Sequence, residues 1–281
     1  MRKIGIIAKK GEPEAVKAVV EFLECLKGRG FKFNIESELA SLIDIKGCPM
    51  KDIPARSDVI IVFGGDGTLL GVARLVGSRG VPILGVNMGG LGFITELRRD
   101  EVCENIDVLF SDACCFEERI MLLADVYRGR KKIAQQSALN DIVLNKAALA
   151  RMFELELNID GQYVSTFRAD GLIISTPTGS TAHSLSAGGP VLYPTLETFL
   201  ITPICPHTLT SRPIVLPDTF QADIRIKSGE DVYLTLDGQV GVPLKSDDRV
   251  KVRKADFKTK FLTLHDRDYF KVLRTKLKWG E

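Results

Sequence analysis

The sequence has 281 residues, enough for two domains that each bury a hydrophobic core. Apolar residues make up 45% of it and charged residues 26%, so intrinsic disorder and fibrous repeats are excluded. The 38 basic and 36 acidic side chains leave a formal net charge of +2, without the basic field of a nucleic-acid binder. An anionic ligand therefore has to be held by local groups.

The cysteines and the N-terminus bear on the compartment. None of the six cysteines belongs to a CxxC pair, which favours reduced thiols over a disulfide or zinc framework. The apolar run at residues 4–8 is shorter than the roughly 7 to 15 residues of a signal-peptide core. No stretch approaches the roughly 18 apolar residues of a membrane helix. We therefore expect a cytoplasmic protein with no membrane or nucleic-acid partner.

The first hundred residues alternate between continuous apolar strands and amphipathic helices. The pattern predicts strands at 3–8, 31–35, 59–63 and 83–86, and helices at 12–27 and 68–76. Strands that are apolar on both faces are typical of a parallel α/β sheet with helices on both faces. We predict this architecture for the N-terminal domain.

After about residue 100 the periodicity changes to that of half-exposed antiparallel strands. Residues 153–160 alternate strictly and place Leu155, Leu157 and Ile159 in a core, and similar alternation recurs at 222–226 and 232–236. This half is predicted to be a mostly antiparallel β-sandwich.

The last segment returns to helical spacing. A helix is predicted at 269–279, with Asp268 as its N-cap and Phe270, Leu273 and Leu277 on one apolar face. We expect this helix to return to the first domain. The predicted domains are thus residues 1–100 with about 262–281, and residues 101–261.

The strongest local signal is the segment VIIVFGGDGTLL at residues 59–70. A glycine loop between a parallel strand and a helix presents backbone N–H groups and a helix N-terminus, which suit phosphate. A tight turn is the alternative for the glycines, but Asp66 favours chemistry, since a carboxylate beside phosphate orients a metal or accepts a proton. The Walker A and GxGxxG patterns are absent, which argues against a P-loop ATPase and a dehydrogenase.

From about residue 58 onward the sequence resembles the NAD kinases, which phosphorylate the adenosine-ribose 2'-hydroxyl of NAD to make NADP. GGDGT alone is shared with diacylglycerol and sphingosine kinases, whereas TPTGSTAxSLSAGGP is highly specific. The matching motifs are GGDGT at 64–68, LGVN at 84–87, ND at 140–141, RADG at 168–171, STPTGSTAHSLSAGGP at 175–190, PHTL at 206–209 and DGQ at 237–239.

The resemblance implies a role for each matched residue. Asp66 corresponds to the catalytic base, which in a loose phosphoryl-transfer transition state mostly orients the hydroxyl and takes its proton late. The implied phosphate loop is Gly64, Gly65, Gly67, Thr68 and Asn87. The implied NAD-binding residues are Asp66, Gly67, Asn140, Asp141, Arg151, Arg168, Asp170, Thr181, Ala182, His183, Ser186 and Gln239.

The chain departs from the family pattern at two of these positions. Asp141 stands where the family has Glu, so the acid is one methylene shorter. His183 stands where the family usually has a Tyr that stacks on the substrate, and a histidine adds titration near its unperturbed pKa of about 6.5. We interpret His207 as structural or a subunit contact, and residues 265–268 as helix-capping residues rather than a metal site.

The implied reaction also defines the expected cofactors and partners and the alternative functions. We expect ATP as the donor, with polyphosphate left open, and a divalent metal (Mg²⁺ or Mn²⁺) held through donor phosphates. The resemblance implies a homo-oligomer, a dimer or a tetramer. The alternatives are a lipid kinase that shares GGDGT and a non-catalytic NAD-binding sensor in the same fold.

Overall fold

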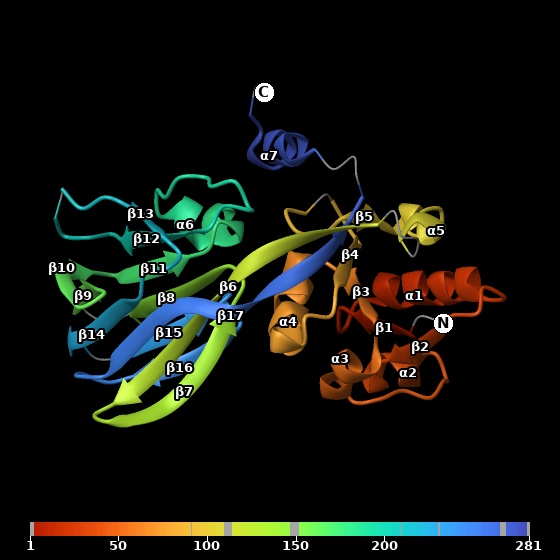
Figure 1. Ribbon diagram of the computed structural model, residues 1–281, viewed down its shortest axis with the longest axis horizontal. Helices are drawn as coiled ribbons and strands as arrows, with labels where there is room; N and C mark the ends of the chain where they lie inside the picture. Colours follow the sequence, from red (N-terminus) through yellow and green to blue (C-terminus); the bar gives the residue numbers. More distant parts are fainter. Residues whose placement is uncertain are drawn as a thin grey trace. The chain divides into compact units, whose positions relative to one another are not determined.

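The structure is a computed structural model that describes residues 3–279 except 91, 110–113, 147–151, 209, 230 and 265–267. The chain forms two compact units, residues 1–118 with 259–281 and residues 119–258 (Figure 1). Strands β6 (Cys115–Arg128) and β17 (Arg249–Thr263) each begin in one unit and end in the other.

The first unit is built on a parallel sheet with the order β4-β3-β1-β2. Its strands are β1 (Lys3–Ala8), β2 (Lys32–Ile35), β3 (Val59–Gly64) and β4 (Ile83–Asn87), with the short β5 (Leu97–Arg98) beside β4. The end of β17 pairs with the same edge of β4 as β5, opposite β3, where Phe261 pairs with Ile83 in parallel. The predicted parallel sheet is confirmed.

Helices cover both faces of this sheet. Alternate strand residues point to opposite faces, and both sets are apolar or small. Leu84 and Val86 belong to the core cluster that includes Phe22 of α1 (Pro13–Leu26). Gly85 between them faces Leu69 of α4 (Asp66–Val76). Figure 1 shows α1 and α4 on opposite faces. The shorter helices of this unit are α2 (Ser37–Leu42), α3 (Ile53–Arg56) and α5 (Ile106–Leu109).

A disulfide links Cys25 at the end of α1 to Cys103, 78 residues later. The prediction that all cysteines are reduced is therefore wrong for this pair. Sequence spacing cannot detect such a bond, because the two residues meet only when α1 packs beside the segment that follows β5. Cys48, Cys114, Cys115 and Cys205 are not part of a disulfide.

The second unit consists of two antiparallel β-sheets, as predicted. One has the order β13-β12-β11-β8-β15-β16. Its strands are β8 (Asp141–Lys146), β11 (Gly171–Ser175), β12 (Thr198–Ile204), β13 (Ile214–Pro217), β15 (Val232–Leu236) and β16 (Val240–Leu244). The other contains β7 (Lys131–Ala138), β9 (Phe153–Ile159), β10 (Gln162–Ala169) and β14 (Ala222–Ser228) with β6 and β17.

A single hydrophobic core joins these two sheets. Ile142 and Leu144 from β8 meet Leu155 and Leu157 from β9 in one buried cluster, which confirms the predicted core stripe of residues 153–160. Residues 143 and 145 of β8 therefore face the other side of their sheet. That outer face carries the polar groups of the site described below.

The final helix α7 (Tyr269–Leu277) belongs to the first unit. Asp268 caps it as predicted, since its side chain accepts a hydrogen bond from the Lys271 N–H at 3.0 Å. Its buried side chains are Val272 and Leu273, whereas Phe270 is exposed, so the predicted apolar face is wrong at that residue. Across the described residues, no helix combines the length and hydrophobicity needed to cross a bilayer.

Candidate functional site

The glycine loop, residues 64–68, connects the end of β3 to the start of α4. A Cβ on Gly64 would lie 2.5 Å from Thr68 Oγ1, so a side chain at that position is excluded unless the loop moves. Gly65 is the N-cap of α4 and has open space around its Cα. The loop therefore offers bare backbone at a helix N-terminus, a geometry that suits an anionic group.

Asp66 lies in the first turn of α4 with its carboxylate turned toward residues 92–95. Oδ2 accepts a hydrogen bond from the Phe93 N–H at 2.9 Å, and Oδ1 accepts from the N–H groups of Ile94 and Thr95 at 3.1 and 3.3 Å. A Cβ on Gly92 would lie 2.4 Å from Asp66 Oδ1. The carboxylate is thus fixed by three backbone donors that approach it closely because residue 92 is glycine.

Asn87 at the end of β4 supports the same segment. Its Nδ2 donates to Thr95 Oγ1 at 2.8 Å, and its Oδ1 accepts from the Gly89 N–H at 2.7 Å. The side chain is buried. In the structure Asn87 thus orders the loop that anchors Asp66; its predicted contact with phosphate stays a prediction.

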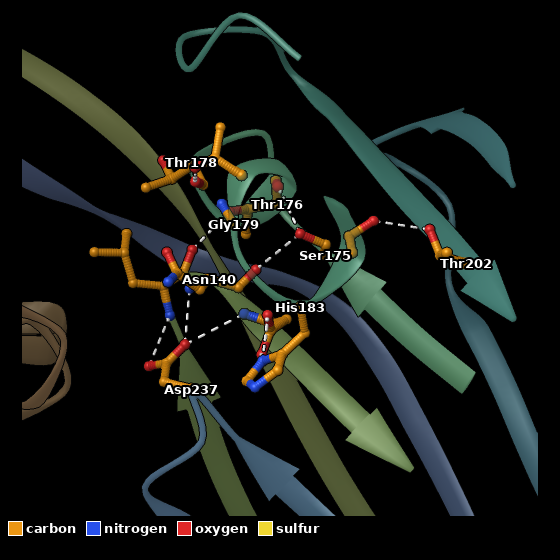
Figure 2. Close-up of polar contacts among 12 residues, drawn as sticks. Asn140, Ser175, Thr176, Thr178, Gly179, His183, Thr202 and Asp237 are labelled. Atoms are coloured by element: carbon orange, nitrogen blue, oxygen red, sulfur yellow. Dashed lines mark hydrogen bonds and ion pairs between the residues drawn. The ribbon is translucent and has the colours of Figure 1, made fainter. Parts of the chain in front are cut away.

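The second unit contains a buried carboxylate, that of Asp237, which holds a segment of backbone in place. Asp237, which follows β15, accepts hydrogen bonds from the N–H groups of Leu139, Asn140 and Asp141 at 3.2, 2.8 and 3.3 Å (Figure 2). Its own N–H donates to the Asp141 carbonyl at 2.9 Å. Asp237 therefore fixes the backbone where residues 139–141 lead into β8.

The hydroxyl-rich segment, residues 175–186, packs on this same backbone. Thr176 donates from Oγ1 to the Leu139 carbonyl at 2.6 Å and accepts from the Gly179 N–H at 3.1 Å. A Cβ on Gly179 would lie 2.1 Å from the Asn140 carbonyl oxygen. Figure 2 shows Ser175, Thr176 and Gly179 gathered around Asn140. The motif thus requires its threonine and glycine for close packing of two chain segments.

His183 in α6 (His183–Ser186) forms a pair with Asp141. Its Nδ1 lies 3.2 and 3.1 Å from the two carboxylate oxygens of Asp141, a residue with 0% exposure. The hydrogen bond with Asp141 raises the pKa of the His183 imidazole above its ordinary value. Partial burial opposes this shift, and the negative charges of Asp141 and Asp237 reinforce it. The charged imidazolium is therefore favoured at this position.

A cavity of about 450 Å³ opens beside His183. That volume lies within the usual range for small-molecule sites. It is lined by Val143, Asn145, Ile173, His183, Ser186, Ala187, Ile204, Cys205, Thr235 and Gly238. The lining combines apolar side chains from the outer face of the six-stranded sheet with a few polar groups, as expected of a site for a nucleoside-sized ligand.

The second unit contains two buried amide oxygens, one of which belongs to a residue that lines this cavity. The Oδ1 atoms of Asn140 and Asn145 are buried and lack a hydrogen-bond partner among the described residues. Buried polar atoms are normally paired, so an unpaired acceptor favours a missing donor such as water or a ligand. Asn145 also lines the cavity.

The structure brings only some of the predicted NAD-binding residues together. His183 and Ser186 line the cavity, and Asp141 holds His183. Thr181 Oγ1 donates to the Thr178 carbonyl at 3.4 Å, and Asp170 pairs with Lys146 at 3.4 Å. Gln239 and Arg168 are exposed, and Ala182 is partly buried. Arg151 lies outside the described residues.

Sequence reasoning missed most of the cavity lining. Val143, Asn145 and Thr235 lie on strands whose inward residues form the core, so strand alternation could have placed them on the outer face. Cys205 follows β12 with a positive φ of 44° and gave no signal in the sequence. No group of three or more His, Cys, Asp or Glu side chains suited to a metal occurs in the described part of the chain.

Two family descriptions match most of the chain. The ATP-NAD kinase N-terminal domain matches residues 4–113, and the ATP-NAD kinase C-terminal domain matches residues 139–264. An NAD kinase of Geotalea daltonii is 49% identical over 283 residues, with 100% of each chain covered. An NAD kinase of Geobacter sulfurreducens has the same identity and coverage.

Solved structures show the same fold. Yeast NADH kinase complexed with NADH gives a TM-score of 0.92 at 27% identity, covering 100% of this chain and 89% of the other. An NAD kinase from Archaeoglobus fulgidus in complex with ATP gives a TM-score of 0.78 at 24% identity, with 98% of each chain covered. The second similarity concerns the fold alone.

Proposed function

The chain belongs to the ATP-NAD kinase family, and we propose that it transfers the terminal phosphoryl group of ATP to the adenosine-ribose 2'-hydroxyl of NAD. The observation that carries this proposal is the 49% identity to NAD kinases over the whole length of both chains. It favours an NAD kinase over a lipid kinase, which would share only the glycine loop.

The glycine loop is proposed to hold the donor phosphates. Gly65 leaves open space at the N-cap of α4, while Gly64 packs against Thr68, and the first N–H groups of α4 point out of its N-terminus. Thr68 adds a hydroxyl in the first turn of the helix. These groups attract negative charge without a lysine, in agreement with the absence of a Walker A motif.

A divalent metal fits this arrangement only through the phosphates. The described residues contain no protein cluster that could hold the metal by itself, and the Asp66 oxygens already accept backbone hydrogen bonds. Mg²⁺ or Mn²⁺ bound to the donor would neutralise charge on its phosphate oxygens.

Asp66 is proposed to act on the acceptor hydroxyl. The 2'-oxygen forms a bond to the terminal phosphorus, the bond to the ADP oxygen breaks, and the hydroxyl proton leaves toward the carboxylate. A carboxylate offers about four acceptor positions, and the three backbone hydrogen bonds leave room on Oδ2 for a hydroxyl. These backbone donors also hold the carboxylate in a fixed orientation.

The second unit is proposed to bind NAD. The cavity beside His183 and Ser186 is the supporting geometry, and Asn145 offers it a buried acceptor that has no partner among the described residues. The remaining assignments rest on family resemblance, and they concern Gly67, Asn140, Arg151, Arg168, Asp170, Thr181, Ala182 and Gln239. A homo-oligomer, a dimer or a tetramer, is proposed on the same basis. A cytoplasmic location is proposed from the short apolar run at residues 4–8 and the lack of a stretch long enough for a membrane helix.

The test is direct assay of NADP formation. Purified protein with NAD, ATP and Mg²⁺ should form NADP, and Asp66→Asn should lower kcat by roughly 10²- to 10⁴-fold. Matched reactions replace ATP with polyphosphate, or NAD with diacylglycerol vesicles. A protein that binds NAD but forms no NADP with either donor would be a sensor. Phosphorylated lipid would identify a lipid kinase. An Asp66→Asn variant as fast as the wild type would contradict the assignment of Asp66 as the base.

A further inference from the structure

Asp141 and His183, the two positions at which the resemblance implies a departure from the family pattern, contact each other. The His183 imidazole lies within hydrogen-bond distance of both Asp141 carboxylate oxygens. The residues lie on different elements, β8 and α6, and are 42 positions apart. The fold therefore brings the two side chains into one interaction.

We propose that Asp141 is a positioning residue and that His183 Nε2 is the group that this cavity offers to the dinucleotide, so that NAD binds more tightly to imidazolium than to neutral imidazole. This inference rests on the proposed function, because it concerns the NAD-binding part of the same site.

Asp141 is poorly placed to contact a ligand. Its side chain has 0% exposure, and both carboxylate oxygens lie within 3.2 Å of His183 Nδ1. Its backbone is fixed in both directions, since its N–H donates to Asp237 Oδ1 and its carbonyl accepts from the Asp237 N–H. Asp141 therefore acts through the histidine.

His183 is well placed to contact a ligand. Its side chain is 56% exposed and lines the cavity, beside a glycine at position 238. Because an ionised carboxylate only accepts hydrogen bonds, Nδ1 carries the hydrogen in this pair. Nε2 on the other side of the ring is then an acceptor in the neutral imidazole and a donor in the imidazolium. Protonation of His183 therefore changes Nε2 from a hydrogen-bond acceptor into a donor toward the cavity.

The charges around the imidazole favour its protonated form. Asp141 faces it from β8 and Asp237 from the turn after β15, while the Cys205 thiol lines the same cavity. The other three residues of α6, Ser184, Leu185 and Ser186, are uncharged. Among the described lining residues, His183 alone can carry positive charge near neutral pH. NAD carries an anionic pyrophosphate, so it gains attraction from the imidazolium.

Calorimetry of NAD binding tests the proposal. The wild-type Kd should weaken about three- to tenfold as the pH rises from about 6 to 8.5, since a charge-assisted hydrogen bond is lost. Binding to the imidazolium also implies proton uptake. Titrations near the upper part of this range, in two buffers with different ionisation enthalpies, should therefore differ in apparent heat.

Substitutions of His183 and Asp141 test whether the proton that is taken up binds to this pair. His183→Gln and His183→Tyr should lose both proton uptake and the pH step, and the exposed side chain at this position allows either variant to fold. Asp141→Asn keeps the size of the side chain but removes its charge, so the step should move to lower pH. His207→Gln changes the other described histidine and should behave like the wild type.

Two results would overturn the proposal. One is wild-type NAD binding whose affinity is independent of pH and takes up no proton. The other is a His183→Gln variant that retains the pH step. If no NAD binds at any pH and no NADP forms, the proposed function itself fails, which is a distinguishable outcome.

Discussion

The glycine loop of the first unit and the hydroxyl-rich segment of the second unit differ in what their glycines do. Gly64 allows close approach of Thr68, and Gly92 allows backbone donors to reach the Asp66 carboxylate. In the second unit Gly179 packs against the Asn140 carbonyl, and polar side chains such as Thr176 and Asp237 fix the surrounding backbone. The first site is made of backbone with one reactive side chain, and the second is a side-chain network.

This difference has a consequence for substitution. In the first unit, Asp66 carries the proposed chemistry and its neighbours serve to hold it. In the second unit, Asp141 and His183 are both members of the polar network and contact each other. A side-chain network can exchange one hydrogen-bonded pair for another, whereas a loop that depends on the absence of Cβ atoms cannot.

The largest expected effect concerns the disulfide, which is confined to the first unit. Reduction, or the double substitution Cys25→Ser and Cys103→Ser, should lower the free energy of unfolding of that unit by about 4 kcal/mol, because the bond closes a loop of 78 residues. Hydrogen exchange resolved by segment should show faster exchange in β1, β3 and β4.

The double variant supplies the control for this experiment. Reductant should not alter it further, and amides of β8 and β11 in the second unit should keep their protection. Equal loss of protection in both units would contradict the confinement of the effect to the first unit.

The second prediction concerns Gly179. Gly179→Ala should destabilise the second unit by about 3 kcal/mol, since its Cβ would lie 2.1 Å from a backbone oxygen that cannot simply rotate away. Gly241→Ala is the matched control, because no atom lies within 4 Å of a Cβ at that position. Urea unfolding followed by circular dichroism compares the two; similar midpoints would show that the segment repacks easily.

The sequence predicted the fold where hydrophobic periodicity determines it. The apolar run at residues 59–63 became β3, and the alternation at residues 153–160 put Leu155 and Leu157 into the core. The Cys25–Cys103 bond could not be predicted, because it depends on tertiary packing across 78 residues. Phe270 was misassigned because helical spacing does not reveal which flank of a short helix is covered.

The site was predictable to a smaller extent. Motif resemblance selected Asp66 and His183, but spacing along the chain could not show that residues 93–95 donate to Asp66 or that His183 contacts Asp141. Cavity residues such as Asn145 lie on ordinary-looking strands, and their importance follows only from the face of the sheet on which they lie. Such contacts between distant segments are what a single sequence does not specify.

The third prediction separates positioning from stability in the first unit. Gly92→Ala should reduce kcat by about 10²-fold, because its Cβ would lie 2.3 Å from Thr95 Oγ1 and 2.4 Å from Asp66 Oδ1 and would displace the carboxylate. Gly90→Ala has open space and should retain most activity. Steady-state kinetics of NADP formation measure both, with melting temperature as a check on folding; unchanged kcat in Gly92→Ala would mean that Asp66 does not need this anchorage.

The smallest expected effect is acid sensitivity of the second unit, through Asp248. Burial raises the pKa of this carboxyl, but hydrogen bonds from Arg128 and the Lys245 N–H outweigh it and hold the pKa below its ordinary value. A depressed pKa contributes stability that is present above the unfolded value near 3.9 and is lost as the pH falls through the folded value. Asp248→Asn should therefore lower the free energy of unfolding at pH 7 by on the order of 1 kcal/mol, and this variant should lose less stability than the wild type between about pH 4 and pH 2.

Urea unfolding at several pH values measures this effect. The control is Asp247→Asn, at an exposed neighbour that pairs with Arg225. Parallel pH profiles for wild type and Asp248→Asn would show that the Arg128 pair does not contribute to acid stability.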